Sequence, residues 1–542
     1  MAKNHSAQAG PDNRNHCGHQ HGSGQQDHPE EGTEAPSLTA VPRSHQLQAR
    51  GRELRHRLPR SEQNAFILPD DRDPVAIIKE QNSRRIPDLV PVRMGRMLQS
   101  PFSYYRGTAG PMAYDLAASP TTDLRVVSCG DAHISNFGFF ASPERALLFD
   151  LNDFDEGAVA PWEWDLKRLA ASVHIGGRDT GLSEDQCAAA TRAAAVAYQT
   201  SLAKLMKLTA LERFYLQVNV ERVKDFITDP SDRKLARRTA KKAMRRTSDQ
   251  VLGKMTTQPA GGRRVIVDQP PITRHVDNIS LQDLAGAYRG YMSTLREDTA
   301  VLLSQFDMVD FVLRVVGVGS VGTRCYVGLF EGPADEPLFL QVKEATTSVL
   351  VRYGGMPPVV MSRVARDGRR RLANIPIYSQ GHRVVAAQRA LQAQSDPFLG
   401  WYEYSVGTNS GLSVAGSGSS VDGGMARSEA ADSRAISAVL NDDDSRFFYY
   451  FRQFRDMKGS VDLAALSPTQ FTRYSELCGN LLARAHSQSP LAHAVTGYLG
   501  STGKFAKSIA SWAKNYADRC EKDFEILQRA ARNGAVPVET GV

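Results

Sequence analysis

Two short apolar runs of the sequence end in side chains that could bind a metal ion and orient a reacting group. The first run, Arg125 to Cys129, is followed by Gly130-Asp131, and Asn136 comes five residues after that aspartate. An aspartate and an asparagine at this spacing on one tight loop can point at one spot. There the aspartate would orient a hydroxyl group and the asparagine would ligate Mg²⁺.

The second run, Ala146 to Leu151, ends in a cluster of carboxylates formed by Asp150, Asp153, Asp155 and Glu156. A carboxylate at the end of a neighbouring strand can complete a magnesium site, because hard oxygen ligands suit Mg²⁺ and phosphate oxygens fill the remaining positions. Asp and Asn also end strands simply because their side chains bond the backbone of turns. Polar positions at two successive strand ends favour the metal site over that alternative.

A third stretch contains the glycines Gly317, Gly319 and Gly322 and the lysine Lys343. The G-x-G-x-x-G pattern suits a Rossmann turn, the phosphate-covering hairpin of a kinase or an ordinary turn. A Rossmann motif opens a helix, whereas the residues after Gly322 alternate and are typical of a strand. A following apolar strand, Leu338 to Lys343, delivers one lysine, for which phosphate is a suitable partner. A plain β-meander with an edge lysine is the alternative.

The loop from Gly130 to Asn136 resembles the catalytic loop of aminoglycoside phosphotransferases and choline kinases, which reads H-G-D-x-H-x-x-N. Cys129 stands where those kinases have the first histidine. The segment from Asn152 to Leu166 resembles their I-D-[FW]-x-D…G-x-P-x-x-D-L motif. By spacing from Asp165, Asp153 is the counterpart of the metal-binding aspartate, and Asp150 and Asp155 are its rivals. Asp165 is expected to brace the catalytic loop through His133.

A longer run, from Arg93 to Leu169, resembles a bacterial family known as domain of unknown function 2252. That likeness covers most of the chain after residue 55 and brings no established substrate.

In ordinary kinases the glycine loop and the lysine precede the catalytic loop, whereas here they follow it. The resemblance therefore implies a circular permutation, which termini close together on a domain surface would tolerate. Two later segments fit this order. Phe447 to Phe454 reads as a hinge strand between lobes, and Tyr474 to His486 resembles the L-A-x-x-H helix that directly precedes the catalytic loop in those phosphotransferases.

The implied fold class is α/β (α+β), a bilobal protein kinase-like fold, circularly permuted, with a largely helical larger lobe and a small antiparallel-sheet lobe. The expected parts are a disordered His-rich tail, residues 1–55; the first part of the catalytic lobe, 56–300; the β-rich nucleotide-binding lobe, 301–406; a flexible Gly/Ser insertion, 407–433; and the hinge strand with the remaining helices, 434–542.

Composition narrows the class of protein further. The chain has 542 residues and a net charge of +7, with no apolar run of membrane-spanning length and no visible signal peptide, so a cytoplasmic protein without a membrane partner is expected. Part of the charge lies between Arg233 and Arg246, whose basic residues recur at helical spacing. This stripe is a solvated helix face, a docking surface for an acidic or phosphorylated substrate, or a site of weak nucleic-acid contact. No aromatic interleaving or motif supports nucleic acid.

Arg93, Arg96 and Arg106 precede the catalytic loop. Two interpretations stay open for them, phosphate binding and pairing with the carboxylates nearby.

The resulting functional hypothesis is a phosphotransferase that uses ATP and Mg²⁺ on an unknown small-molecule or protein acceptor. Asp131 would orient the acceptor hydroxyl, and Asn136 and Asp153, with Asp155 beside them, would hold Mg²⁺. Lys343 would contact the nucleotide phosphates, and Gly317, Gly319 and Gly322 would cover them.

Two alternatives are an enzyme that transfers AMP and a nucleotide-binding pseudokinase. One feature favours the pseudokinase alternative: the expected helix from Gly381 to Gln394 has no acid to pair with Lys343, although Gln388, Glu344 or Glu403 could substitute.

Overall fold

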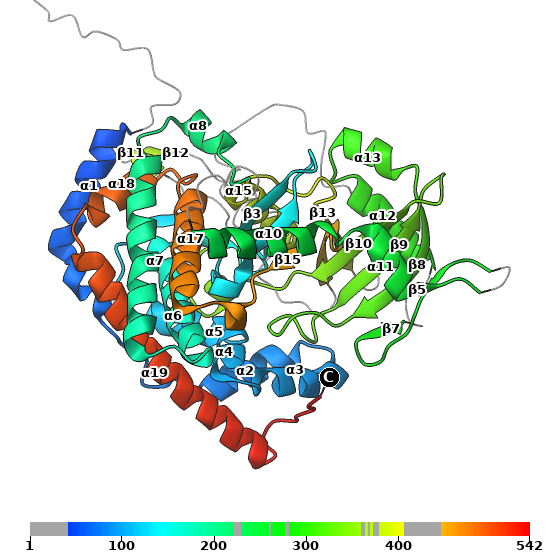
Figure 1. Cartoon of the computed structure of the whole chain (residues 1–542), viewed down its shortest axis with the longest axis horizontal. Coiled ribbons are helices and arrows are strands. Elements are labelled where there is room, and N and C mark those ends of the chain that lie inside the picture. Colours follow the sequence, from blue (N-terminus) through cyan, green and yellow to red (C-terminus); the bar gives the residue numbers. More distant parts are fainter. Residues whose placement is uncertain are drawn as a thin grey trace, which may run out of the picture. The chain divides into compact units, whose positions relative to one another are not determined.

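The computed structural model describes residues 42–219, 229–259, 262–276, 281–358, 364–366, 369–371, 379–405 and 446–541. These residues form a mixed α+β structure in which the N-terminal and C-terminal helices lie side by side (Figure 1). The predicted insertion at 407–433 lies outside the described residues.

The first third of the chain contains α1 (Ser44–Arg57), η1 (Arg60–Asn64), α2 (Pro74–Ser83), η2 (Pro87–Leu89), α3 (Val90–Met97), α4 (Pro101–Arg106), α5 (Ala109–Ala117), β1 (Arg125–Ser128), η3 (Ile134–Asn136), β2 (Phe137–Ala141), β3 (Leu147–Leu151), β4 (Ala158–Pro161), α6 (Trp162–Asp179), α7 (Glu184–Leu205) and α8 (Ala210–Tyr215).

The middle contains α10 (Pro230–Met244), α11 (Ser248–Met255), β5 (Thr256–Thr257), β6 (Val265–Ile266), β7 (Thr273–His275), α12 (Leu281–Met292), α13 (Glu297–Leu303), β8 (Asp307–Arg314), β9 (Cys325–Glu331), β10 (Pro337–Glu344), α14 (Val349–Arg352), β11 (Val364–Arg366), β12 (Arg369–Arg371), α15 (Gln380–Leu391) and β13 (Gly400–Ser405). The last part contains β14 (Arg446–Gln453), β15 (Gly459–Ser460), η4 (Leu463–Ala465), α17 (Pro468–His486), α18 (Ala492–Leu499) and α19 (Lys504–Arg532).

One antiparallel sheet of six strands has the order β13-β14-β10-β9-β8-β7. In its central strand Lys343 lies opposite Cys325 on β9 and Tyr450 on β14, so these three side chains share a face. The other face is covered by α12, where Tyr291 stacks on Phe451 with ring centroids 4.0 Å apart. The predicted β-rich segment 301–406 therefore supplies only part of this sheet, because β7 and β14 lie outside it.

Two smaller sheets carry the acidic loops. Strand β1 pairs with β4, and β2 pairs with both β3 and β15. The loop after β1 holds Asp131 and Asn136, and the loop after β3 holds Asp153 and Asp155. Both strands predicted from the apolar runs are thus confirmed, and the strand predicted over Phe447 to Phe454 is found as β14.

Helices α6, α7, α17 and α19 pack against one another in a large buried core, and α6 and α17 also contact strands of these sheets. The N-terminus of α7 is fixed by a capping box between Ser183 and Gln186. Trp162, at the start of α6, stacks on Tyr198 of α7 with ring centroids 5.8 Å apart. This packing holds α6 against α7.

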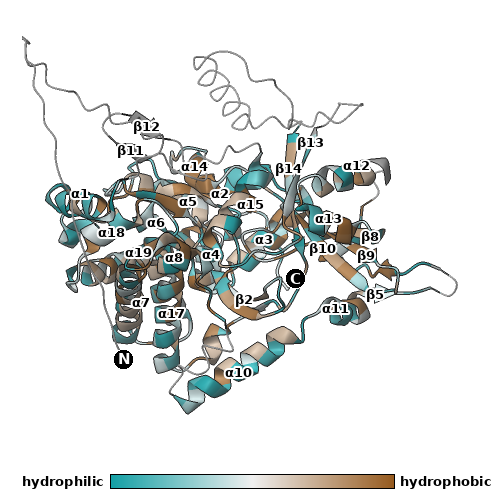
Figure 2. Cartoon of the chain, turned by 90° about the horizontal axis from the view of Figure 1, so that it is seen from above, coloured by the Kyte–Doolittle hydropathy of each residue, from teal (hydrophilic) through white to brown (hydrophobic). Residues whose placement is uncertain are grey.

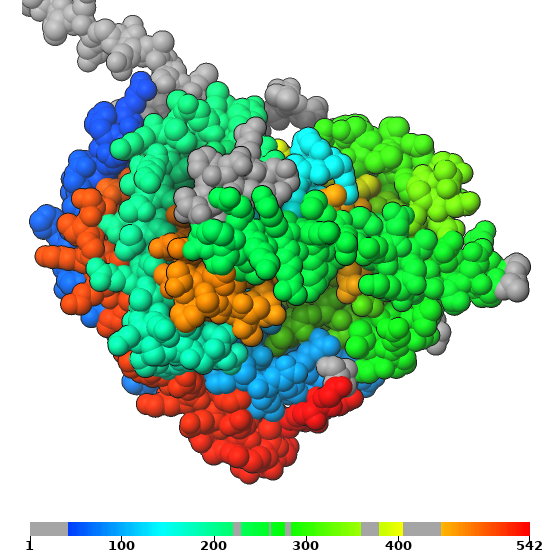
Figure 3. All heavy atoms as spheres, viewed as in Figure 1, coloured from blue at the N-terminus to red at the C-terminus, as the bar shows by residue number. Residues whose placement is uncertain are grey.

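The basic stripe forms α10, which lies on the surface in the view of Figure 3 and carries several strongly hydrophilic turns in Figure 2. Its small residues Ala240 and Ala243 are buried, and it contacts β15 and β2. The helical prediction is confirmed, and the stripe's role stays a prediction.

The expected disorder of residues 1–55 is wrong for residues 44–55, which belong to α1. Leu47 is buried there, and Gly51 meets α18 so closely that a Cβ at Gly51 would lie 1.9 Å from the carbonyl oxygen of Ala494. The segment is polar in composition, so its one small packing surface, around Leu47 and Gly51, could not be recognised from composition. Residues 1–41 lie outside the described residues.

Gly51→Ala is expected to lower the free energy of unfolding by about 1–3 kcal/mol, because the added methyl overpacks the contact with α18. Gly253→Ala in α11 is the matched control, since nothing lies within 4 Å of its Cβ position and alanine favours a helix. Urea unfolding of both variants measures the difference. Equal stabilities of the two variants would contradict the close contact.

Candidate functional site

The loop after β1 is held in place by the buried carboxylate of Asp165, near the start of α6. Its two oxygens accept hydrogen bonds from the backbone N–H groups of Cys129 at 2.7 Å and Gly130 at 2.9 Å. The Nε2 atom of His486, the last residue of α17, lies 3.1 Å from the same carboxylate. Asp165 therefore braces the loop as expected, but its histidine partner is His486 and not His133.

Asp131 projects from this loop toward α6. Its Oδ1 accepts a hydrogen bond of 2.8 Å from Nε of Arg168, whose guanidinium lies over the ring of Tyr105. The Nε2 atom of His133 is 3.8 Å from Oδ2. Burial lowers the pKa of His133 to about 4, so its ring is neutral at pH 7. Asp131 thus has one strong cationic partner and keeps a quarter of its side chain, 25%, exposed.

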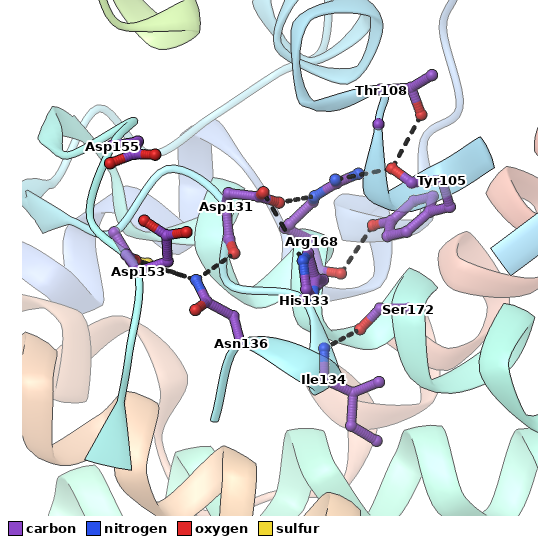
Figure 4. Close-up of polar contacts among 12 residues, drawn as sticks. Tyr105, Thr108, Asp131, His133, Ile134, Asn136, Asp153, Asp155, Arg168 and Ser172 are labelled. Carbon is purple, nitrogen blue, oxygen red and sulfur yellow. Dashed lines mark hydrogen bonds and ion pairs between the residues drawn. The ribbon is translucent and has the colours of Figure 1, made fainter. Parts of the chain in front are cut away.

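Asn136 links the two acidic loops (Figure 4). Its Nδ2 donates to the backbone carbonyl of Asp131 at 2.9 Å and to that of Asp153 at 3.0 Å. With the amide nitrogen engaged in both bonds, the side-chain oxygen is the atom left to ligate a metal ion.

Lys343 reaches the acidic loop from the six-stranded sheet. Its Nζ lies 2.5 Å from Oδ2 of Asp155 and 3.5 Å from Oδ1 of Asp153, and the hydroxyl of Tyr450 donates to Oδ1 of Asp155 at 2.6 Å. The lysine is only 2% exposed. A sheet residue and two loop residues nearly 190 positions apart in the chain therefore meet at one place.

Charge in this cluster is strongly coupled. Burial would raise the pKa of Asp153, but the positive charges of Lys343 and then Arg452 outweigh burial and hold that pKa well below its usual range. Burial and the neighbouring Asp153 raise the pKa of Asp155. Burial would lower the pKa of Lys343, but both carboxylates raise it. The cluster favours an ionised Asp153 and a charged lysine.

The other residues offered as partners of Lys343 are engaged elsewhere. Glu344 pairs with Arg324 at 3.1 Å, Glu403 pairs with Arg446, and the side chain of Gln388 bonds to Gln392. The expected substitution by one of them is therefore wrong, and the lysine is instead paired within the acidic loop.

Asp150 does not join the acidic cluster. Its carboxylate accepts hydrogen bonds from the backbone of Leu151 at 2.9 Å and Ala393 at 3.0 Å, and it lies 3.6 Å from Arg484. As a buried residue within β3, it holds α17 and the end of α15. It is no longer a rival for a metal-binding role.

The glycine loop joins β8 to β9, so the predicted strand, loop, strand arrangement is confirmed and no helix opens after it. Gly317 and Gly322 adopt left-handed backbone angles, φ 68° and 86°, that favour glycine. Arg96 donates to the carbonyl of Gly317 at 2.6 Å, and the N–H of Ile86 donates to that of Gly322 at 2.8 Å. The loop is therefore held against the segment from α2 to α3.

A cleft lies between the glycine loop, the acidic loops and the segment from α2 to α5. Its carboxylates are Asp131, Asp153, Asp155, Glu156 and Glu344, its arginines are Arg85, Arg93 and Arg106, and its glycine-loop residues are Gly319, Ser320 and Thr323. The predicted site residues Asp131, Asp153, Asp155 and Gly319 line it directly. Asn136 and Lys343 are not among the lining residues but bond to those that are, and Gly317 and Gly322 flank Gly319 in the glycine loop.

Sequence reasoning missed Arg168, Tyr450 and Arg452, as well as Lys458, which lies close enough to Asp153 to lower its pKa. Tyr450 and Arg452 alternate on β14, and this period places both on the Lys343 face. That alternation is the one sequence signal that could have identified Tyr450 and Arg452.

Glu156 offers a test by pH. Burial raises its pKa to about 7, although its Oε2 accepts a 2.6 Å hydrogen bond from the N–H of Val349. Between pH 4.5 and 7 the native protein thus holds a proton that the unfolded chain has lost, and stability is lost as pH rises through this window. Relative to Glu156→Gln, the wild type should lose about 1–3 kcal/mol of unfolding free energy from pH 4.5 to 7. If chemical unfolding showed the same pH dependence of the unfolding free energy for wild type and Glu156→Gln, the raised pKa of Glu156 would be contradicted.

The donor set fits Mg²⁺ bound together with a phosphate group. Among the described residues, no group of three or more His, Cys, Asp or Glu side chains could hold a metal ion alone. Magnesium is commonly held by one or two carboxylates, with substrate phosphates and water completing its shell. The carboxylates of Asp153 and Asp155 and the amide oxygen of Asn136 meet that requirement.

These features define a mixed α+β protein with an acidic, arginine-walled cleft beside a lysine-bearing antiparallel sheet. The chain belongs to the bacterial family described as "Uncharacterized protein conserved in bacteria (DUF2252)", whose model matches residues 85–409 and 421–530. The resemblance to domain of unknown function 2252 that was found in the sequence is thereby confirmed. Neither a curated protein nor a solved structure matches the chain significantly. None of the helices within the described ranges has the length and apolar character needed to cross a membrane.

Proposed function

We propose that this chain is an ATP- and Mg²⁺-dependent phosphotransferase with a bilobal, circularly permuted kinase-like fold. The observation that carries the proposal is the contact of Lys343, on β10, with Asp155 and Asp153 on the loop after β3. A glycine loop followed by a strand lysine, facing carboxylates and an asparagine, is the arrangement that kinases use around a nucleotide triphosphate.

Each residue has a role in this proposal. Asp153, Asp155 and Asn136 would hold Mg²⁺, which neutralises charge on the phosphate oxygens when bound. Lys343 would move from Asp155 to the nucleotide phosphates, and the glycine loop would cover them. Asp131, oriented by Arg168, would accept the proton of the acceptor hydroxyl.

The permutation is supported by the place of α17. His486 at its end meets Asp165, and Ser489 just beyond it accepts a 2.9 Å hydrogen bond from the N–H of Val127 on β1. The helix that resembles the one before a kinase catalytic loop therefore lies beside that loop in space, although more than 300 residues separate them in the chain.

A nucleotide-binding pseudokinase is the second candidate, and one observation favours it. Lys343 is paired with the very carboxylates proposed to hold the metal ion, and α15 carries no acid to draw it away. In that case the cleft would bind nucleotide without turnover.

Incubation of the full-length protein with ATP and Mg²⁺, followed by mass analysis of all nucleotides, separates the candidates. Accumulation of ADP supports phosphoryl transfer, AMP or pyrophosphate supports AMP transfer, and unchanged ATP that still binds supports the pseudokinase. Asp153→Asn is the control, because any product formed equally by this variant would come from a contaminant.

A further inference from the structure

Three arginines line the cleft, Arg93 buried and Arg85 and Arg106 half-buried, and no described carboxylate lies within ion-pair distance of any of them. Arg85 follows α2, Arg93 lies in α3 and Arg106 ends α4, and all three line the cleft together with its carboxylates. Buried charges are normally paired, because an uncompensated buried charge is costly. A cationic wall without anionic partners therefore indicates that an anion from outside the chain completes it.

The hydrogen bonds of the arginines support this reading. Arg93 is 1% exposed, and its acceptors among the described residues are all neutral, including Asn82 at 2.5 Å and the carbonyl of Gly107 at 3.1 Å. Arg85 donates to the carbonyl of Val321 at 2.5 Å. Arg106 donates no hydrogen bond to any described residue.

The Nε–H groups of all three arginines are buried without a partner among the described residues. Burial lowers the pKa of each guanidinium. The negative charge of Asp131 opposes this lowering for Arg106, and the charges of Glu344 and Glu156 oppose it for Arg85. An anion near Arg106 would therefore lie beside Asp131, the residue that would orient the acceptor.

We propose that Arg85, Arg93 and Arg106 bind a phosphate group carried by the acceptor, so that the substrate class is a phosphorylated hydroxyl compound. This inference rests on the proposed function. Phosphate fits better than carboxylate, because it brings close to two negative charges and three strong acceptor oxygens to three guanidinium groups. The acceptor phosphate would lie against the arginines while its hydroxyl faces Asp131.

Calorimetric titration of the full-length protein with inorganic phosphate, in the absence of metal and nucleotide, tests the subsite. Arg106→Gln should weaken phosphate binding at least tenfold, and Arg106→Lys should weaken it less. Arg52→Gln, at an exposed position of α1, should leave phosphate binding unchanged. Melting curves of the Lys and Gln variants check that both are folded. Equal phosphate affinity of wild type and Arg106→Gln, or absence of binding to the wild type at millimolar phosphate, would overturn the inference.

Repeating the titration with nucleotide identifies the source of the phosphate. If the subsite serves the acceptor, phosphate binds in the presence of both Mg²⁺·ADP and a Mg²⁺-bound non-hydrolysable ATP analogue. Displacement by the analogue but not by ADP would assign the arginines to the terminal phosphate of the nucleotide and overturn the acceptor assignment. Phosphate binding in a protein that binds neither nucleotide would uphold the subsite and reject the proposed kinase function.

Discussion

Replacing Asp131 with Asn is expected to lower turnover by about 10²–10⁴-fold, because a positioned proton acceptor contributes a factor of that size. The substitution keeps the shape of the side chain and an oxygen that can accept the 2.8 Å hydrogen bond from Arg168. ATP binding should therefore stay nearly intact. Steady-state rates and nucleotide affinities of the two proteins, measured with the same acceptor, separate loss of chemistry from loss of binding.

The matched control is Asp123→Asn, two residues before β1. Asp123 is 61% exposed and, within the described part of the chain, pairs with Arg125 alone; its left-handed backbone conformation suits Asn equally well. This variant should have wild-type turnover. A turnover of Asp131→Asn equal to that of Asp123→Asn would exclude Asp131 as the proton acceptor.

Asp165→Asn is expected to lower the free energy of unfolding by about 3–5 kcal/mol, since it removes a buried charge that satisfies several donors. The carboxylate accepts from the N–H groups of Cys129 and Gly130 and faces Nε2 of His486, so an amide group would place its own N–H against one of these donors. Urea unfolding measures the loss. A change below about 0.5 kcal/mol, which is typical of exposed positions, would contradict the bracing role.

Local parts of the site could be predicted from the sequence because they depend on neighbours in the chain. Asp131 and Asn136 share one loop, and the strand period after Gly322 distinguishes a hairpin from a Rossmann turn. Strand ends and turn residues, which can be recognised in the sequence, were enough to place Asp131, Asn136 and the glycine hairpin.

The long-range pairs could not be predicted, because packing of distant segments decides them. Lys343 and Asp155 are 188 residues apart, and Asp165 and His486 are 321 apart. Asp150 resembles the site residues in type and position, yet its backbone environment within β3 directs it to Arg484. In the same way, only the fold reveals that Arg93 and Arg106 lack carboxylate partners among the described residues.

The central claim, that the cleft binds ATP through a magnesium ion, is tested most directly by unfolding the protein with ATP in the presence and absence of Mg²⁺. With Mg²⁺ and ATP at about 100 times Kd, stabilisation of about 2.7 kcal/mol is expected. Without the metal ion, or in Asp153→Asn, it should largely disappear. Equal stabilisation of the wild type by ATP with and without Mg²⁺ would contradict the proposed site.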